Sequence, residues 1–262
     1  MAYLNIKNLN FSYGNRIAID DISLDIDSIS NIAICGPSGS GKSTLIKLLT
    51  ANKFGTGSII FNGHDVKIDN LVPIKKNIGA VFNDGIFIYD IVLEELQANL
   101  NNLMLSSRDV TERLKEIVEF FDLHEILKEK IENLRYSDKM LIKILSVLIT
   151  YPDVICIDEV FEYLVDSDKE KLMEYLKYNR IKTIITFSDL EFCTYCEYLV
   201  VLLDGKIVDI GTTLNVLKNE KLIKRLGLNL PFYVDLSTQL CYYDLIDKVV
   251  FNKEDLTKLL WK

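Results

Sequence analysis

Residues 35–44 read CGPSGSGKST, and this short stretch decides the fold of the chain. The apolar run 31–35 leads into it and predicts a buried strand, whereas the apolar-periodic segment 45–49 that follows predicts a helix. A strand, the pattern G-x-x-x-x-G-K-S and a helix, in this order, form the context of a phosphate-binding P-loop. A glycine-rich turn before an ordinary helix is the alternative, but the complete motif in its complete context favours the P-loop.

The residue types of this stretch suit a nucleoside triphosphate. Glycines let the backbone curl so that N–H groups point at phosphate oxygens, and the start of the helix adds partial positive charge. Lys42 is expected to reach the β- and γ-phosphates, and the Ser43 hydroxyl is expected to bind Mg²⁺. The predicted phosphate-binding residues are Gly36, Ser38, Gly39, Ser40, Gly41, Lys42, Ser43 and Thr44.

Composition limits the class of protein. Apolar residues make up 49% of the 262-residue chain, so a sizeable core can form without disulfides or metal. The net charge of −8 argues against a nucleic-acid partner, because such proteins usually present a basic face. We see no signal peptide and no uncharged apolar run of membrane-spanning length, so we expect a soluble, cytoplasmic protein. A membrane partner remains open.

Five cysteines fit a reduced compartment. Cys193 and Cys196 form a C-x-x-C at helical spacing, but no second pair and no nearby histidine completes a zinc site. Two cysteines on one helix face are therefore favoured over metal or redox chemistry.

Hydrophobic periodicity predicts the remaining elements. Alternating residues predict two half-buried antiparallel strands at 3–9 and 22–26, separated by a turn with two aromatics at 11–15. Further strands are predicted at 58–61, 78–82, 154–157, 183–186 and 199–203. An inserted lobe over about 84–151 is predicted to contain helices at 94–105, 111–121 and 138–150. Two more helices are predicted at 169–178 and 190–198. This alternation predicts a doubly wound, mostly parallel sheet in a domain over 1–210, followed by a mainly helical extension over 211–262.

Asp158 and Glu159 follow the apolar run that begins at Val154. In a P-loop protein, a carboxylate at the end of a buried strand can hold Mg²⁺ through water, and we assign this role to Asp158. Glu159 is then the candidate base that polarises the attacking water. An acidic pair after a strand can also be a simple turn, but the P-loop favours the catalytic interpretation.

The order of aromatic turn, P-loop, helical lobe and strand-Asp-Glu resembles the ATP-binding subunits of ABC transporters. The resemblance covers nearly the whole chain and implies an α/β P-loop NTPase with an antiparallel β subdomain and an inserted helical lobe. In that family two subunits sandwich ATP, and each site pairs one chain's P-loop with the other's signature sequence. Residues 226–232 are similar to a segment of energy-coupling-factor (ECF) importers.

The resemblance implies roles for further residues. Tyr13 matches the aromatic residue that stacks on adenine, although a tyrosine that merely packs is the alternative. Asn83 falls where the family has a glutamine that touches Mg²⁺ and contacts the membrane subunit. Ser188 occupies the place of the family's switch histidine. Residues 134–138, LRYSD, fall where the family has Leu-Ser-Gly-Gly-Gln, so Arg135 and Ser137 become candidates for contact with the partner's nucleotide.

The departures from the family pattern concern hydrolysis. Tyr136 and Ser137 replace the signature glycines, so they bring side chains where the backbone should approach phosphate. Asp138 adds a negative charge that disfavours ATP by about 1–3 kcal/mol at an effective dielectric of about 20. Arg135 can offset this charge by pairing with phosphate, and the balance stays open. Ser188 is too short to act as a histidine at the γ-phosphate. The sequence thus supports ATP and Mg²⁺ binding more firmly than hydrolysis.

Three function classes remain open. The chain is an energising ATPase subunit docked on a membrane transporter, a regulatory and slowly hydrolysing half of a heterodimer, or an ABC-type protein of DNA repair or translation. The single nucleotide domain, the acidic charge and the lack of heptads argue against the third class. The predicted partners are a second ABC ATPase subunit, in a heterodimer rather than a homodimer, and a membrane transport subunit. The expected location is the inner face of the cell membrane.

Overall fold

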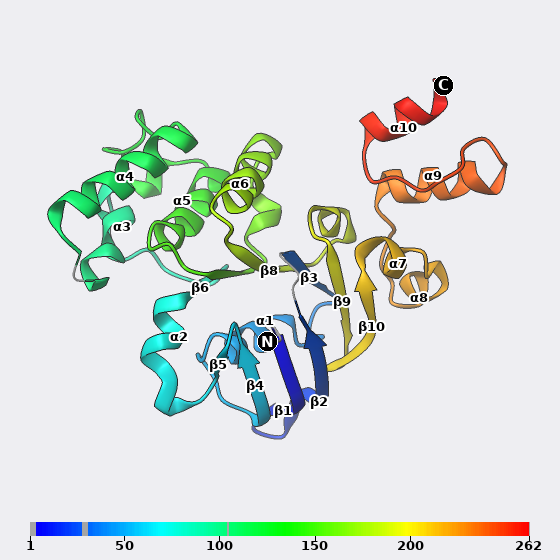
Figure 1. Cartoon of the computed structure of the whole chain (residues 1–262), viewed down its shortest axis with the longest axis horizontal. Coiled ribbons are helices and arrows are strands. Elements are labelled where there is room, and N and C mark those ends of the chain that lie inside the picture. Colours follow the sequence, from blue (N-terminus) through cyan, green and yellow to red (C-terminus); the bar gives the residue numbers. More distant parts are fainter. Residues whose placement is uncertain (1–3, 28–30, 104, 262) are drawn as a thin grey trace.

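A computed structural model describes residues 4–27, 31–103 and 105–261 (Figure 1). Within these residues the strands form a central sheet with the order β10-β9-β3-β8-β7-β6 and a smaller sheet with the order β2-β1-β4-β5. In the central sheet all neighbouring strands are parallel except β9 and β10. Its strands are β3 (Asn31–Cys35), β6 (Ile78–Phe82), β7 (Val154–Asp158), β8 (Lys182–Phe187), β9 (Tyr198–Leu203) and β10 (Lys206–Thr212). The predicted mostly parallel sheet is confirmed.

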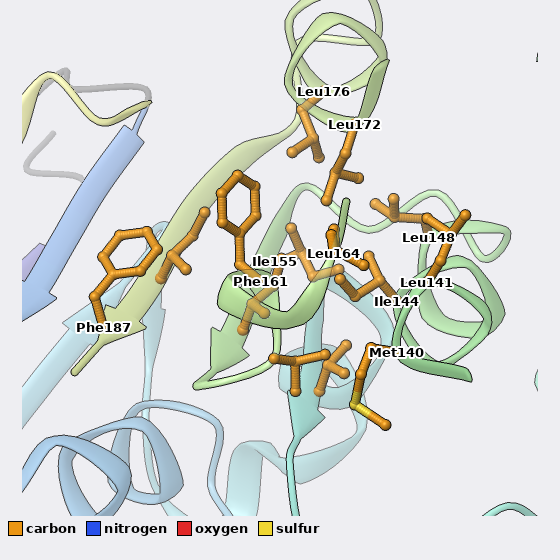
Figure 2. Packing of buried hydrophobic residues seen from close by; sticks show 14 of the residues in the cluster. Met140, Leu141, Ile144, Leu148, Ile155, Phe161, Leu164, Leu172, Leu176 and Phe187 are labelled. Carbon is orange, nitrogen blue, oxygen red and sulfur yellow. The ribbon is translucent and has the colours of Figure 1, made fainter. Parts of the chain in front are cut away.

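The central strands β3, β7, β8 and β9 are buried on both faces, as their continuous apolar runs predict. Along β3, for example, Ala33 and Cys35 join one hydrophobic cluster, whereas Ile32 and Ile34 join the other. The first cluster lies between the sheet and the helical lobe, where Phe161 packs edge-on against Phe187 (Figure 2). The second cluster lies between the sheet, the P-loop helix and the smaller sheet.

The smaller sheet is antiparallel and consists of β1 (Leu4–Tyr13), β2 (Arg16–Ile26), β4 (Thr56–Phe61) and β5 (His64–Asp65). The strands expected at 3–9 and 22–26 exist but are longer, and Tyr3 lies outside the described residues. The turn expected over 11–15 is wrong, because Tyr13 pairs directly with Arg16 and only Gly14 and Asn15 connect the strands. Aromatic residues favour strands, and a two-residue connection is enough for a hairpin.

Helices cover both faces of the central sheet. They are α1 (Lys42–Leu49), α2 (Leu71–Asn77), α3 (Val92–Ala98), α4 (Ser107–Phe121), α5 (Tyr136–Leu148) and α6 (Asp166–Tyr178), with 3₁₀ turns at Ile68–Asn70, Leu100–Leu103, Ile131–Asn133, Phe161–Tyr163 and Leu190–Tyr195. The segment 84–151, which was predicted to form an inserted lobe, contains α3, α4 and α5 (Figure 1), and its division from the rest of the domain stays a prediction. The helix expected over 94–105 is shorter, since α3 ends at Ala98 and a 3₁₀ turn follows; residue 104 lies outside the described part of the chain.

The helix expected over 190–198 is wrong. The chain forms a 3₁₀ turn from Leu190 to Tyr195 and enters β9 at Tyr198. The Asp189 side chain accepts from the backbone N–H of Glu191 at the start of this turn, and the segment keeps the tighter winding of a 3₁₀ turn, which is common in connections between strands. Cys193 and Cys196 are both buried at this turn, where burial raises the pKa of each thiol.

The C-terminal part after β10 is helical, with α7 (Thr213–Leu217), α8 (Glu220–Arg225), α9 (Phe232–Tyr242) and α10 (Lys253–Leu260). The last two helices project away from the smaller sheet (Figure 1). Strand β10 was not predicted, because its alternating exposed and half-buried residues lack the continuous apolar run of the other strands. It runs past position 210, and the division into two domains there stays a prediction. Among the described residues, no helix has the length and apolar character needed to cross a bilayer.

Candidate nucleotide-binding site

The P-loop connects the end of β3 to the start of α1, as predicted. Gly41 precedes α1 with φ of 107°, and a methyl group there would lie 2.6 Å from the Ala18 carbonyl oxygen. A methyl group on Gly36 would lie 2.1 Å from the Leu202 carbonyl oxygen. Both positions therefore require glycine. No side chain caps α1, so the N–H groups of its first turn remain available to an anion.

A cavity of about 330 Å³ opens in front of this loop. The end of the β1–β2 hairpin and the P-loop line this cavity, and Glu159 lines it as well. Two of the residues predicted to bind phosphate, Gly36 and Ser40, do not line the cavity. The Gly36 carbonyl accepts a hydrogen bond from Lys42, and the Ser40 hydroxyl is buried with no hydrogen-bond partner among the described atoms. The lining residues are Tyr13, Arg16, Ala18, Ser38, Gly39, Gly41, Lys42, Ser43, Thr44 and Glu159.

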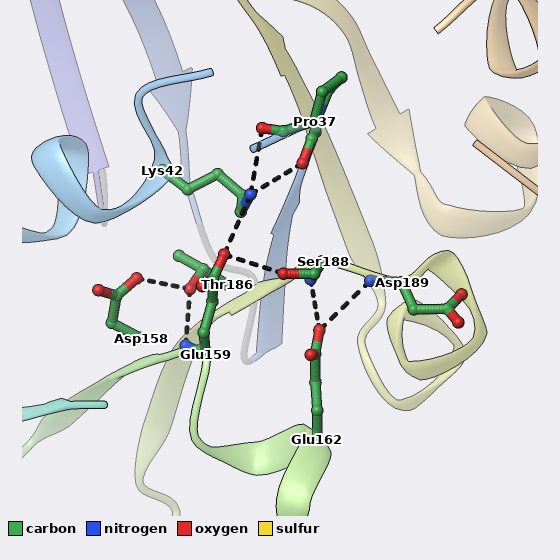
Figure 3. A network of polar contacts seen from close by, with 9 residues as sticks. Pro37, Lys42, Asp158, Glu159, Glu162, Thr186, Ser188 and Asp189 are labelled. Carbon is green, nitrogen blue, oxygen red and sulfur yellow. Dashed lines mark hydrogen bonds and ion pairs between the residues drawn. The ribbon is translucent and has the colours of Figure 1, made fainter. Parts of the chain in front are cut away.

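Lys42 is buried and fully engaged. Its Nζ donates to the Gly36 carbonyl oxygen at 2.8 Å and to that of Pro37 at 3.4 Å, and it forms an ion pair with Glu159 Oε1 at 3.1 Å (Figure 3). An ammonium group has three protons, so these three acceptors occupy all of them. A phosphate group that binds Lys42 therefore has to replace one of these acceptors. The carboxylate is the one that does not belong to the P-loop.

Asp158 lies at the carboxyl end of β7 and is 5% exposed. Burial raises the pKa of its carboxyl group, while hydrogen bonds from Thr186 and Ser43 act in the opposite direction. The Thr186 hydroxyl donates to Asp158 Oδ1 at 2.7 Å and accepts from the Glu159 N–H at 3.0 Å. Carboxylate and hydroxyl oxygens are the ligands that Mg²⁺ prefers, so the pair of Ser43 and Asp158 fits this cation.

Ser188 joins the two glutamates of the site (Figure 3). Its hydroxyl donates to Glu159 Oε1 at 3.0 Å, the same oxygen that pairs with Lys42. The Glu162 carboxylate accepts from the backbone N–H groups of Ser188 and Asp189. Burial raises the pKa of Glu162, and these two backbone donors oppose the rise. A continuous chain of contacts thus runs from Lys42 through Glu159 and Ser188 to Glu162.

The remaining predicted residues lie outside this cavity. The Arg135 guanidinium pairs with Asp138 through two bonds, Nε to Oδ2 at 2.9 Å and Nη2 to Oδ1 at 3.0 Å. Ser137 donates to the same carboxylate at 3.4 Å. Tyr136 donates to Asn83 Oδ1 at 3.3 Å, so the Asn83 side chain contacts the start of α5. From the sequence, the charges of Arg135 and Asp138 were treated separately, but in the structure they form an ion pair with each other.

Sequence reasoning missed three residues of the site, namely Arg16, Thr186 and Glu162. Thr186 is the partner of Asp158 in the parallel pairing of β7 and β8, and this pairing follows only from the strand order. Glu162 lies three residues after Glu159, a spacing that alone carries no signal. Arg16 directly follows the hairpin turn, and a correct prediction of that turn would have put it beside Tyr13.

The site combines a glycine-containing loop before α1 with a buried aspartate at the end of a β-strand and a glutamate next to that aspartate. These features define a P-loop nucleotide-binding protein. The family model described as ABC transporter matches residues 19–162. The chain belongs to the ABC transporter family, and it carries the ATP-binding ATPase domain of that family. The resemblance seen in the sequence is confirmed.

A relative agrees with this assignment, and a solved structure shares the fold. The chain is 32% identical over 250 residues to the energy-coupling factor transporter ATP-binding protein EcfA1 of Mycoplasmopsis pulmonis, covering 90% of this chain and 93% of the relative. It is 26% identical to EcfA of Aster yellows witches'-broom phytoplasma, covering 99% and 98%. In fold it is similar to cbiO1 of Clostridium perfringens, part of the ABC transporter complex cbiONQ, with a TM-score of 0.74, 22% identity and coverage of 86% and 94%.

Proposed function

We propose that the chain is an ATP-binding subunit that couples ATP binding and hydrolysis to transport by a membrane partner, in an ECF-type importer. The observation that carries this proposal is the complete P-loop with Lys42 held beside Glu159. Relatives named as ECF transporter ATP-binding proteins match over most of their own length, which supports the ECF assignment. Docked in this way, the chain lies peripherally on the inner face of the cell membrane.

We assign roles to residues that line the cavity or lie next to it. Lys42 and the P-loop N–H groups bind the phosphates, and Tyr13 stacks on the adenine. Ser43 and Asp158 hold Mg²⁺, which neutralises phosphate charge when it is bound. Glu159 accepts a proton from the attacking water, and Ser188 orients its carboxylate through their hydrogen bond.

The partner ATPase is proposed to be a different chain. The stretch that would face a partner's nucleotide presents the closed ion pair of Arg135 and Asp138, together with the exposed rings of Tyr136 and Tyr163, whose centroids lie 5.1 Å apart. Two copies of this chain would each lack the signature glycines and the switch histidine. A second ATPase with these motifs intact would place a complete signature sequence at the ATP site that contains Glu159. The alternative is that this chain is the regulatory, slowly hydrolysing half of such a pair, and the serine at position 188 favours it.

Turnover separates these arrangements. We expect slow ATP hydrolysis by the isolated chain, faster hydrolysis by the pair with an intact partner, and a modest gain in the pair from Ser188→His. Arg135→Ala should lower the activity of the pair, because it removes the cation able to approach the partner's phosphate and leaves Asp138 unpaired. Steady-state ATPase assays of the chain alone and of the co-purified pair measure these effects. Fast hydrolysis by the isolated chain would contradict the heterodimer proposal.

The membrane subunit is proposed to dock beside the segment that follows β6. Ile86 and Ile88 are exposed there, and the N–H groups of Ile88 and Tyr89 both donate to the Glu95 carboxylate, which fixes the loop against α3. A neighbouring cavity of about 430 Å³ suits a short helix of the membrane subunit. Its lining residues are Phe87, Tyr89, Asp90, Lys130, Ile131, Glu132 and Lys139.

Cross-linking tests this docking. A photo-reactive phenylalanine analogue at Ile86 should capture a membrane protein in intact cells, because the side chain is 88% exposed beside the cavity. The same analogue at Val72, which is 80% exposed on α2, is the matched control and should give no such product. Equal capture from both positions, or none from Ile86, would contradict the docking proposal.

A further inference from the structure

Arg16 is a cation of the nucleotide cavity to which the sequence assigned no role. It is the first residue of β2 and pairs with Tyr13 across the hairpin. Its side chain reaches the P-loop, since a methyl group placed on Gly39 would lie 3.2 Å from Arg16 Nη2. The hairpin thus places a guanidinium on the wall that Tyr13, Lys42 and Ser43 also line.

The two cations of the cavity differ in their bonding. Lys42 is buried, and its protons are shared among two carbonyl oxygens and Glu159. Arg16 is exposed, and its guanidinium forms no hydrogen bond or ion pair with any described residue. A guanidinium that already has a carboxylate partner, such as that of Arg135, would lose this contact on meeting phosphate. Arg16 has only water to give up, so its donors are available to a ligand.

We propose that Arg16 binds a phosphate group of the nucleotide, closing on it from the β1–β2 hairpin while Lys42 holds it from the P-loop. The guanidinium presents a planar set of donors that matches phosphate oxygens, and this geometry favours phosphate over the sugar or the base. The inference rests on the proposed function, because it requires a nucleotide in this cavity. It adds a residue that recognises the phosphate chain and connects the smaller sheet to the bound nucleotide.

Binding measurements with a phosphate series test the proposal. Arg16→Ala should weaken MgATP binding about tenfold, the loss expected for one charged hydrogen-bonded contact, and should change adenosine binding little. Arg16→Lys should recover part of the affinity, since it keeps the charge and loses the planar fork. The loss caused by Arg16→Ala should shrink as salt is raised.

Arg108→Ala is the matched control. It removes the same charge from an exposed site on α4, where Arg108 pairs with Glu112 outside the cavity, and it should leave nucleotide affinity unchanged. Thermal unfolding without nucleotide should be the same for Arg16→Ala and the wild type, because the side chain has no partner to lose. This comparison separates a binding effect from a folding effect.

The outcomes distinguish a failure of the role proposed for Arg16 from a failure of the proposed function. A wild-type chain that binds no MgATP would overturn the proposed function itself. A wild-type chain that binds MgATP, with an Arg16→Ala variant of equal affinity, would overturn only the role of Arg16. Equal losses for adenosine and MgATP would also overturn it, because they would indicate contact with the base or the ribose.

Discussion

Lys42→Ala is expected to lower the affinity for MgATP by about a hundredfold or more. The variant loses charged hydrogen bonds to the phosphates, each worth about 1.5–3 kcal/mol. It also leaves Glu159 unpaired at the cavity, where its negative charge repels phosphate. Isothermal titration calorimetry with MgATP measures the loss directly.

Lys76→Ala provides the control for this variant. Lys76 is exposed on α2, so the change removes the same charge outside the cavity and should leave affinity unaltered. Thermal unfolding of both variants shows whether each is folded. Wild-type affinity in a folded Lys42→Ala variant would refute the assignment of the P-loop as the nucleotide site.

Glu159→Gln is expected to move hydrolysis and binding in opposite directions. The amide cannot accept a proton from water, so ATP hydrolysis by the assembled pair should fall by about 10²–10⁴-fold, the contribution typical of a general base. Affinity for MgATP should rise several-fold, because phosphate no longer competes with a carboxylate for Lys42. Single-turnover hydrolysis and equilibrium binding of MgATP measure the two effects separately.

Glu162→Gln tests whether this rise in affinity depends on the ion pair. Glu162 contacts the backbone of Ser188 and Asp189 and not Lys42, so its amide variant should not bind MgATP more tightly. If both variants gain affinity equally, the effect is a general loss of negative charge near the cavity. If Glu159→Gln hydrolyses ATP at the wild-type rate, Glu159 is not the base.

The sequence predicted the P-loop and the central strands because their signals are local. Residues 31–49 contain the strand, the glycines, Lys42 and the helix at fixed offsets, and β7 is a continuous apolar run that ends in Asp158. The two-residue hairpin turn and the short connection before β9 were misjudged, since neighbouring strands determine how much chain is left for a turn. β10 was missed because it is an edge strand with a half-exposed face.

The contacts around the site depended on information that periodicity does not carry. Thr186 meets Asp158 only because β8 lies next to β7 in the sheet. Arg135 pairs with Asp138 because residues three positions apart lie on the same side of a helix start. Thr186 and Arg135 can both be read from the sequence, but the residue that each one contacts depends on the three-dimensional arrangement.

The ion pair between Lys42 and Glu159 also bears on how nucleotide leaves. When product dissociates, a buried ammonium without a counter-charge would be costly, and this cost would oppose release. If Lys42 binds the phosphates, Glu159 is positioned to take over the ammonium as they depart, which would lower the free energy of the vacated site and favour release of product. One carboxylate would then act at two moments of the cycle, on the water during cleavage and on the lysine during exchange.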